Sequence, residues 1–230
     1  NPPSPARPTT LFMAASVPAP KSILGPSSSR RVTLSAAARV SRKRRTQPSP
    51  AELFSEGLAL VGDELIQLSW RAGLAKRFDV DSFEPGDTHA YEGEGWGLCH
   101  DGERLIMSDG SARLTFRDPH TFEATGAVEV TFGDTPLRRL NELECVDGDV
   151  WANVWLTDAI VRIDPAHGHV TGVLDLRGLI EPHPAKADAG AVLNGIAWDA
   201  AASTFLVTGK YWPELIEIRV EDPAEEEAPV

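Results

Sequence analysis

Short apolar segments separated by turns recur along the chain from residue 51 onward, and they predict a protein built of β-strands. The segments either alternate apolar with polar positions or are apolar throughout, and Gly, Asp and Pro residues lie between them. Asp63, Asp101-Gly102 and Asp147-Gly148 mark tight turns directly after short apolar segments. No sustained helical period appears, so we expect an all-β domain.

The strand-like segments repeat in four units of similar layout. Each unit has an anchor residue in its first strand, at Leu58, Leu98, Leu143 and Ile196. A turn and a second apolar segment follow each anchor, and a third segment ends at an acidic residue: Asp79, Asp118, Asp164 and Glu217. The acid stands 20 or 21 positions after its anchor in every unit. A fourth strand follows in the first three units, around residues 88–91, 127–130 and 170–174.

Four strands per unit, at a spacing of 40–53 residues, are typical of β-propeller blades. The predicted fold class is therefore all-β, a β-propeller with about four blades visible. A β-sandwich is the alternative, but it would have to produce four matched offsets by coincidence. We assign residues 51–222 to the propeller domain and residues 223–230 to an acidic C-terminal tail.

The first fifty residues differ from the rest in composition. They are rich in Ser, Ala, Pro and Arg, and they contain nine of the 22 basic residues and none of the 34 acidic ones. We expect residues 1–50 to be a disordered tail. With a start at Met13 and the basic run Arg42-Lys43-Arg44-Arg45, the tail is typical of a transit peptide for a plastid or mitochondrion, removed on import. A nuclear signal and the secretory pathway are the alternatives.

Charge and cysteine content exclude several classes of function. Residues 51–230 hold the other 13 basic residues and all 34 acidic ones, a formal charge of −21, which repels nucleic-acid phosphates. No stretch of about 18 apolar residues exists, so we expect no membrane-spanning helix. Cys99 and Cys145 lack a CxxC spacing and are expected to be two buried thiols rather than a disulfide framework. We expect a monomer.

The repeat also places a set of polar and aromatic side chains at one equivalent position. Two residues before the anchors stand Glu56, Trp96, Asn141 and Asn194. The innermost strands of a propeller line its axis, so these four side chains should face one another across a central site. Trp70 and Trp155 stand twelve residues after their anchors, and Lys210 lies on the corresponding strand of the last unit.

These residues lie in segments that resemble the plant- and bacterial-type glutamine cyclotransferases. The resemblance covers about residues 53–222 in the order of the family. Its motifs are Phe54-Ser55-Glu56-Gly57-Leu58, Gly93-Glu94-Gly95-Trp96-Gly97-Leu98, Leu105-Ile106-Met107-Ser108-Asp109-Gly110-Ser111, Leu140-Asn141-Glu142-Leu143-Glu144, Ala152-Asn153-Val154-Trp155-Leu156-Thr157-Asp158, Leu193-Asn194-Gly195-Ile196-Ala197 and Val207-Thr208-Gly209-Lys210-Tyr211-Trp212-Pro213. The family has five blades, and its first blade opens with a Phe-Thr-Gln-Gly-Leu-type motif. Here the basic tail leads directly into the segment that corresponds to the second blade of the family, so the first blade seen in this chain is the family's second.

The resemblance implies an enzyme that cyclises the N-terminal glutamine of peptides to pyroglutamate and releases ammonia, without a metal or other cofactor. It implies that Glu56 is the acid–base residue and that Asn141 and Lys210 stabilise the developing oxyanion. Trp70, Trp96 and Trp155 would form the walls of the substrate pocket, together with Phe54. Asn194 would bind the substrate amine or support the other residues.

Two other functions fit the same side chains. Glu56, Asn141 and Asn194 offer oxygen ligands, and such a ring could hold an axial Ca²⁺, as in lactonase-type propellers. Against this, Trp96 cannot ligate and Lys210 would repel a cation. The second alternative is a non-catalytic propeller that binds peptides, in which Glu56 and the tryptophans capture an N-terminal amine.

Overall fold

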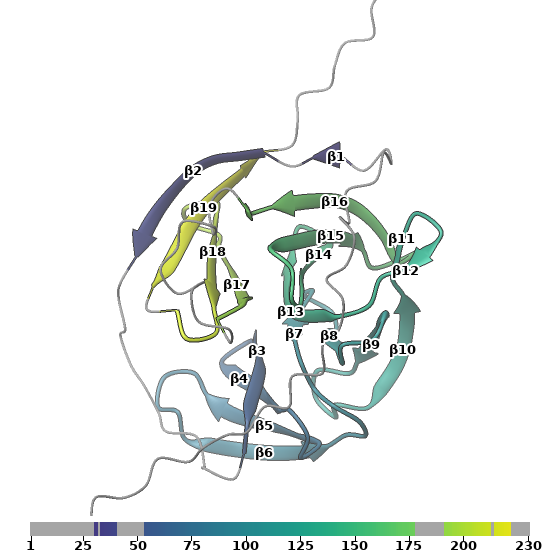
Figure 1. Cartoon of the computed structure of the whole chain (residues 1–230). Coiled ribbons are helices and arrows are strands. Elements are labelled where there is room, and N and C mark those ends of the chain that lie inside the picture. The colour runs from purple at the N-terminus through teal and green to yellow at the C-terminus, as the bar shows by residue number, and fades with distance from the viewer. Residues whose placement is uncertain (1–29, 32, 41–52, 178–190, 213, 222–230) are drawn as a thin grey trace, which may run out of the picture.

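Four β-sheets surround a common centre and form the described part of the protein (Figure 1). This computed structural model describes residues 30–31, 33–40, 53–177, 191–212 and 214–221. Each sheet is one propeller blade, and the strands β3, β7, β13 and β17 lie nearest the centre in Figure 1. No helix among the described residues is long and apolar enough to cross a membrane.

The strands follow the predicted repeat. The first blade holds β3 (Ser55–Val61), β4 (Glu64–Ser69), β5 (Leu74–Asp79) and β6 (Pro85–Ala90). The second holds β7 (Leu98–His100), β8 (Leu105–Ser108), β9 (Arg113–Arg117) and β10 (Ala124–Glu129). The third holds β13 (Leu140–Val146), β14 (Asp149–Val154), β15 (Ala159–Asp164) and β16 (His169–Asp175). The fourth holds β17 (Leu193–Asp199), β18 (Thr204–Gly209), β19 (Leu215–Glu221) and β2 (Thr33–Val40).

Neighbouring strands within each blade are antiparallel, and short strands extend the third blade. β11 (Thr131–Phe132) and β1 (Arg30–Arg31) each pair with β16 in parallel, and β12 (Thr135–Pro136) pairs with β11. The prediction of an all-β propeller is therefore confirmed.

The acidic residue that closes the third strand has a structural reason for its fixed offset. Asp79 Oδ1 accepts the N–H of Ser82 at 2.6 Å, and Asp118 Oδ1 accepts the N–H of Thr121 at 2.8 Å. These carboxylates stabilise the turn that leads into the fourth strand, as Asx-type turns do. Phe122, four residues after Asp118, has a positive φ of 62° and donates its N–H to the Asp118 carbonyl. The repeat thus carries the same turn chemistry in these blades. The fourth blade differs from the prediction, because β19 continues past Glu217 to Glu221 and Glu217 accepts the hydroxyl of Thr204.

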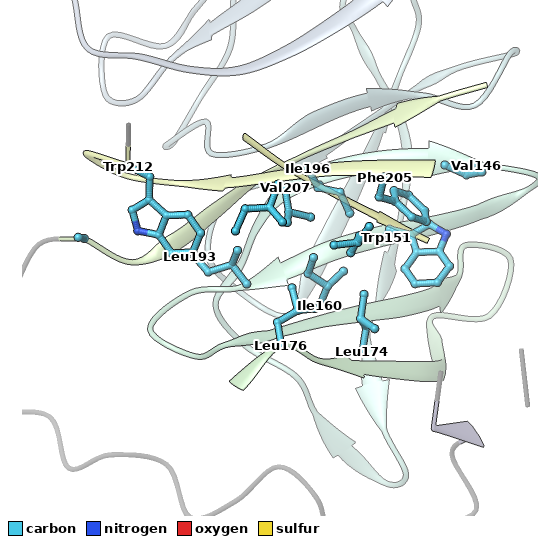
Figure 2. Close-up of a cluster of buried hydrophobic side chains, with 13 residues drawn as sticks. Val146, Trp151, Ile160, Leu174, Leu176, Leu193, Ile196, Phe205, Val207 and Trp212 are labelled. Carbon is cyan, nitrogen blue, oxygen red and sulfur yellow. The ribbon is translucent and has the colours of Figure 1, made fainter. Parts of the chain in front are cut away.

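Apolar clusters join three successive pairs of blades. The cluster between the third and fourth blades includes Trp151, Phe205 and Trp212, all less than 10% exposed (Figure 2). Two further buried clusters join the second blade to the third and the first to the second. Burial of this apolar area is the main favourable term in the folding of such a ring.

The junction between the last and the first blade differs from the other three. No buried apolar cluster among the described residues joins these two sheets. On the face of β3 that points away from the second blade, Leu58 is 47% exposed and Leu60 is 54% exposed. Among the described residues, the apolar packing of the ring therefore runs from the first to the fourth blade and does not cross this junction.

The outer strand of the fourth blade comes from the segment that was predicted to be a disordered tail. β2 pairs with β19 in antiparallel register, from Leu215 opposite Val40 to Glu221 opposite Thr33. The prediction is therefore wrong for Thr33–Val40. The physical reason is that β19 has an open edge whose main-chain groups need partners, and residues 33–40 contain no Pro or Gly to prevent pairing.

The remaining predictions about the termini lie outside the described residues. These include Met13, the basic run at residues 42–45 and the acidic residues 223–230. Removal of the first 45 residues on import stays a prediction. Such removal would take β2 away from the fourth blade.

The two cysteines form a disulfide, and the prediction of two free thiols is wrong. Cys99 on β7 and Cys145 on β13 are bonded, with their Cα atoms 5.5 Å apart. The bond joins the inner strands of the second and third blades, which lie side by side next to the axis. Because the two residues are far apart in sequence, only the packing of neighbouring blades brings them together.

We predict that the double variant Cys99→Ala/Cys145→Ala is less stable than the wild type by about 2–4 kcal/mol, because the bond closes a loop with a sequence separation of 46 residues. Urea unfolding without reductant measures the difference. Reduced wild-type protein serves as the control and should unfold close to the variant. Free thiols at both positions in the unreduced, unfolded wild type would contradict the bond.

Candidate active site

The site lies where the first strand of each blade begins and its second strand ends. In three blades the residue after the second strand donates its N–H to a carbonyl just before the first strand. These bonds are Trp70 to Phe54 (2.8 Å), Trp155 to Arg139 (2.9 Å) and Lys210 to Val192 (2.9 Å). Trp70, Trp155 and Lys210 therefore occupy equivalent places, as the sequence repeat predicted.

The second blade carries Gly110 at the equivalent place, and this glycine makes room for Trp96. A Cβ atom on Gly110 would lie 2.7 Å from the six-membered ring of Trp96, which is too close for any side chain. Gly110 also has a φ of 79°, a conformation that favours glycine. In the second blade, the indole therefore comes from Trp96, just before the first strand of that blade, and not from the residue after its second strand.

An ion pair between the first and fourth blades forms the centre of the site. Lys210 Nζ donates a hydrogen bond to Glu56 Oε1 at 3.2 Å, across 154 positions in the sequence. The Glu56 side chain is 12% exposed and the Lys210 side chain is 33% exposed. Burial raises the pKa of the Glu56 carboxyl above its ordinary value, although Lys210 opposes that shift. Glu56 is therefore a stronger base than a carboxylate in water.

Aromatic side chains surround this pair. Phe54 packs edge-on against Trp70, with ring centroids 5.7 Å apart, and Lys210 Nζ lies 5.4 Å from the centroid of the Phe54 ring. Trp96 packs edge-on against Trp155 at 5.4 Å. The predicted aromatic residues thus form two contacting pairs, one of which also touches the lysine. Such rings exclude water and give planar groups a surface on which to stack.

Asn141 is buried at the start of β13 and holds an unsatisfied polar atom. It is 3% exposed, and its Oδ1 has no hydrogen-bond partner among the described residues. Its main-chain carbonyl accepts the hydroxyl of Ser108 at 2.7 Å, which fixes the backbone against the second blade. Because an unpaired buried amide is costly, this side chain is suited to meet a polar group of a ligand.

Asn194, in contrast, joins two blades through the main chain. Its Oδ1 accepts the N–H of Glu142 at 3.4 Å. Asn153, which sequence reasoning did not select, does the same from the other side, since its Oδ1 accepts the N–H of Gly195 at 3.1 Å. These two amides join the third blade to the fourth.

Three glutamates belong to this region, although sequence reasoning gave none of them a role. Glu94 accepts the indole N–H groups of Trp70 and Trp96. Burial and the nearby Glu56 and Glu144 charges raise the pKa of Glu142 to about 8, and burial raises the pKa of Glu144 to about 7. All three stand inside the family-like motifs, but only their neighbours in space distinguish them from ordinary surface glutamates.

Two oxygen atoms of the predicted ring are engaged by the protein itself, whereas Asn141 Oδ1 is unpaired among the described residues. Glu56 is paired with Lys210, and the Asn194 oxygen is bonded to a main-chain N–H. In the part of the chain that the structure describes, no three His, Cys, Asp or Glu side chains are grouped so that they could hold a metal ion.

These features define a β-propeller in which a half-buried ion pair and four aromatic side chains lie at the beginning of the inner strands. The family model for glutamine cyclotransferase matches residues 22–220, so the chain belongs to the glutamine cyclotransferase family. The match includes β2, in agreement with its place in the fourth blade.

Two relatives support this assignment. The chain is 39% identical over 174 residues to a curated glutaminyl-peptide cyclotransferase from Arabidopsis thaliana, a match covering 73% of this chain and 53% of the relative. It thus spans about half the length of that curated relative. The crystal structure of the Myxococcus xanthus glutaminyl cyclase matches with a TM-score of 0.70 and 40% identity, over 74% of each chain.

The raised pKa of Glu142 predicts how stability depends on pH. The folded protein binds this proton more tightly than the unfolded chain, whose value is near 4.5, so the stabilisation is full below pH 4.5 and is lost as pH rises through about 8. Glu142→Gln should remove this dependence. Between pH 5 and pH 9 the free energy of unfolding of the variant should therefore rise relative to that of the wild type by on the order of 1–3 kcal/mol.

Urea unfolding of both proteins at pH 5, 7 and 9 measures this effect. Glu129→Gln, on an exposed strand position, is the control and should follow the wild type. Parallel pH dependence of the wild type and Glu142→Gln would show that the carboxyl of Glu142 is not held in its neutral form.

Proposed function

We propose that the protein is a glutaminyl-peptide cyclotransferase, an acyltransferase that converts N-terminal glutamine to pyroglutamate and releases ammonia. The observation that carries the proposal is the half-buried pair of Glu56 and Lys210 beside Phe54, in a chain of the glutamine cyclotransferase family. The partners it implies are peptides or proteins with an N-terminal glutamine.

The reaction sets three tasks. The α-amine must be neutral and must attack the side-chain amide carbon, so a new C–N bond forms. The amide oxygen gains negative charge and needs hydrogen-bond donors. The bond from that carbon to the amide nitrogen then breaks, and the departing nitrogen needs a proton in order to leave as ammonia.

Glu56 is suited to the first and third tasks. Its raised pKa makes it a better base for the proton of the amine, and the same proton can then pass to the leaving nitrogen. Proton transfer of this kind typically contributes 10²–10⁴ in rate, most when the pKa of the catalytic group approaches the working pH. The proton is therefore returned within one turnover, and no cofactor is required for this step.

Asn141 and Lys210 are suited to the second task. Lys210 has three donor hydrogens, so it can keep its bond to Glu56 and still donate to the substrate oxygen. Asn141 is buried, and its carboxamide N–H is the group that can donate to this oxygen. Its unpaired Oδ1 is an acceptor, so it would instead take an N–H of the substrate. Loss of one such donor commonly costs about 10²–10³ in rate.

The aromatic side chains are suited to hold the short glutamine side chain in a folded conformation. Trp96 and Trp155 form one contacting pair, and Phe54 and Trp70 form the other. Their surfaces exclude the water that would hydrolyse the amide, and they keep the amine close to the carbon that it attacks.

We further propose that the protein acts as a monomer. We also propose that it acts in a plastid or mitochondrion, and the composition of residues 1–45 supports this location. The Ca²⁺-dependent lactonase alternative is less favoured, because two of the three ring residues, Glu56 and Asn194, already use a side-chain oxygen for a protein partner. A non-catalytic peptide-binding propeller would use the same pocket without proton transfer.

The central test is Glu56→Gln. This change keeps the size of the side chain and a bond to Lys210 but removes the base, so ammonia release from a Gln-initiated peptide should fall by at least about 10²-fold while the fold is unchanged. Coupled ammonia detection and circular dichroism measure the two quantities.

Glu123→Gln, an exposed glutamate in a turn, is the matched control and should keep full activity. Peptide binding by the wild type without ammonia release would support the non-catalytic alternative. Undiminished turnover by Glu56→Gln would remove Glu56 from the mechanism.

A further inference from the structure

One carboxylate holds two of the pocket tryptophans at once. Glu94 Oε2 accepts the Trp70 Nε1–H at 2.8 Å and the Trp96 Nε1–H at 2.9 Å. Trp70 follows β4 of the first blade, whereas Trp96 precedes β7 of the second. The single oxygen of Glu94 therefore fixes the separation of two indoles that belong to different blades.

The other oxygen of Glu94 is held by an exposed arginine, Arg71. Glu94 Oε1 accepts the Arg71 Nε–H at 3.1 Å, and the guanidinium carbon of Arg71 lies 3.9 Å from the centroid of the Trp70 ring. The arginine thus closes the outer side of the arrangement and covers one face of Trp70. Both carboxylate oxygens are occupied, so the carboxylate cannot rotate without loss of hydrogen bonds.

The main chain around Glu94 is equally constrained. Gly95 donates its N–H to the Trp70 carbonyl at 3.0 Å, and a Cβ atom on Gly95 would collide with the hydroxyl of Tyr91. That hydroxyl donates to the Ser69 carbonyl at the end of β4. The connection between the first two blades is therefore tied to the first blade on both sides of Glu94.

The charge state of Glu94 agrees with this arrangement. Burial alone would raise its pKa, but the hydrogen bonds from Trp96, Trp70 and Arg71 outweigh burial and lower the pKa below its ordinary value. Glu94 is therefore ionised at neutral pH. Glu56 and Glu94 are thus shifted in opposite directions, since the pKa of Glu56 is raised and the pKa of Glu94 is lowered.

We propose that Glu94 is a positioning residue that sets the spacing of Trp70 and Trp96 and thereby the orientation of the substrate. This inference rests on the proposed cyclotransferase function for its effect on rate, but not for its effect on the indoles. Glu94 touches no reacting atom in this assignment. Its contribution is the geometry of the aromatic walls, where a displacement of about 1 Å can cost up to 10²-fold in rate.

Two substitutions separate positioning from charge. Glu94→Gln loses the charge but keeps a carbonyl oxygen at the same reach, which can accept both indole N–H groups. Glu94→Asp keeps the charge but is one methylene shorter and cannot reach both indoles. Positioning therefore predicts that the Gln variant is more active than the Asp variant, whereas a purely electrostatic role predicts the reverse order.

The experiment measures kcat and KM for ammonia release from a Gln-initiated peptide, together with tryptophan emission of the unliganded proteins. We expect kcat to fall by about 10- to 100-fold in Glu94→Asp and Glu94→Ala, and by less than about 5-fold in Glu94→Gln. Emission should change in the Asp and Ala variants, because at least one indole N–H loses its hydrogen-bond acceptor, and least in the Gln variant, which keeps an oxygen at the same reach. Glu92→Ala, an exposed residue two positions away, is the control and should match the wild type.

The outcomes distinguish this inference from the proposed function. If the wild type releases no ammonia, the proposed function fails. The tryptophan emission of the variants still tests whether Glu94 positions Trp70 and Trp96. Wild-type kcat and unchanged emission in Glu94→Asp would overturn the inference, and so would an Asp variant more active than the Gln variant. Should Glu94→Ala not fold, the comparison of Gln with Asp decides alone.

Discussion

The hydrogen-bonded ion pair between Glu56 and Lys210 is the interaction on which the site depends. The two residues come from the first and the last described blades, so the pair can form only when all four blades are in place. It also joins the two blades that no buried apolar cluster connects among the described residues. A half-buried carboxylate is costly, and the lysine offsets part of that cost without removing the upward shift of the Glu56 pKa. The same contact therefore links the first blade to the fourth and limits the upward shift of the pKa of the proposed catalytic carboxylate.

The rest of the structure holds this pair in place by repetition. Each blade presents the start of its first strand and the end of its second strand to the same place, and the three matched main-chain bonds at Trp70, Trp155 and Lys210 make these positions equivalent. One scaffold position has thus been differentiated into two indoles and an ammonium. Where the second blade carries Gly110, the ring of Trp96 takes the space. Apolar packing between successive blades and the Cys99–Cys145 bond keep the inner strands together.

Sequence reasoning could predict the parts of the molecule that depend on local pattern. The strand order and the acidic residues Asp79 and Asp118 at the ends of the third strands follow from fixed offsets along the chain, and the equivalence of Trp70 with Lys210 follows from their place in the repeat. It could not predict β2, whose pairing is decided by the open edge of a strand that is distant in the sequence. The disulfide and the roles of Glu94 and Glu142 were missed for the same reason, since each depends on neighbours from another blade.

The most direct test is a double-mutant cycle on Glu56 and Lys210, because the account requires the two residues to act as one unit. The kcat/KM for ammonia release is measured for the wild type, Glu56→Gln, Lys210→Met and the double variant. We predict that kcat/KM of the double variant lies within about 10-fold of that of the poorer single variant. Because each single change should cost about 10²-fold or more, this result corresponds to a coupling of at least about 1.4 kcal/mol. Losses that multiply, with no coupling between the two changes, would contradict the central place given to this pair.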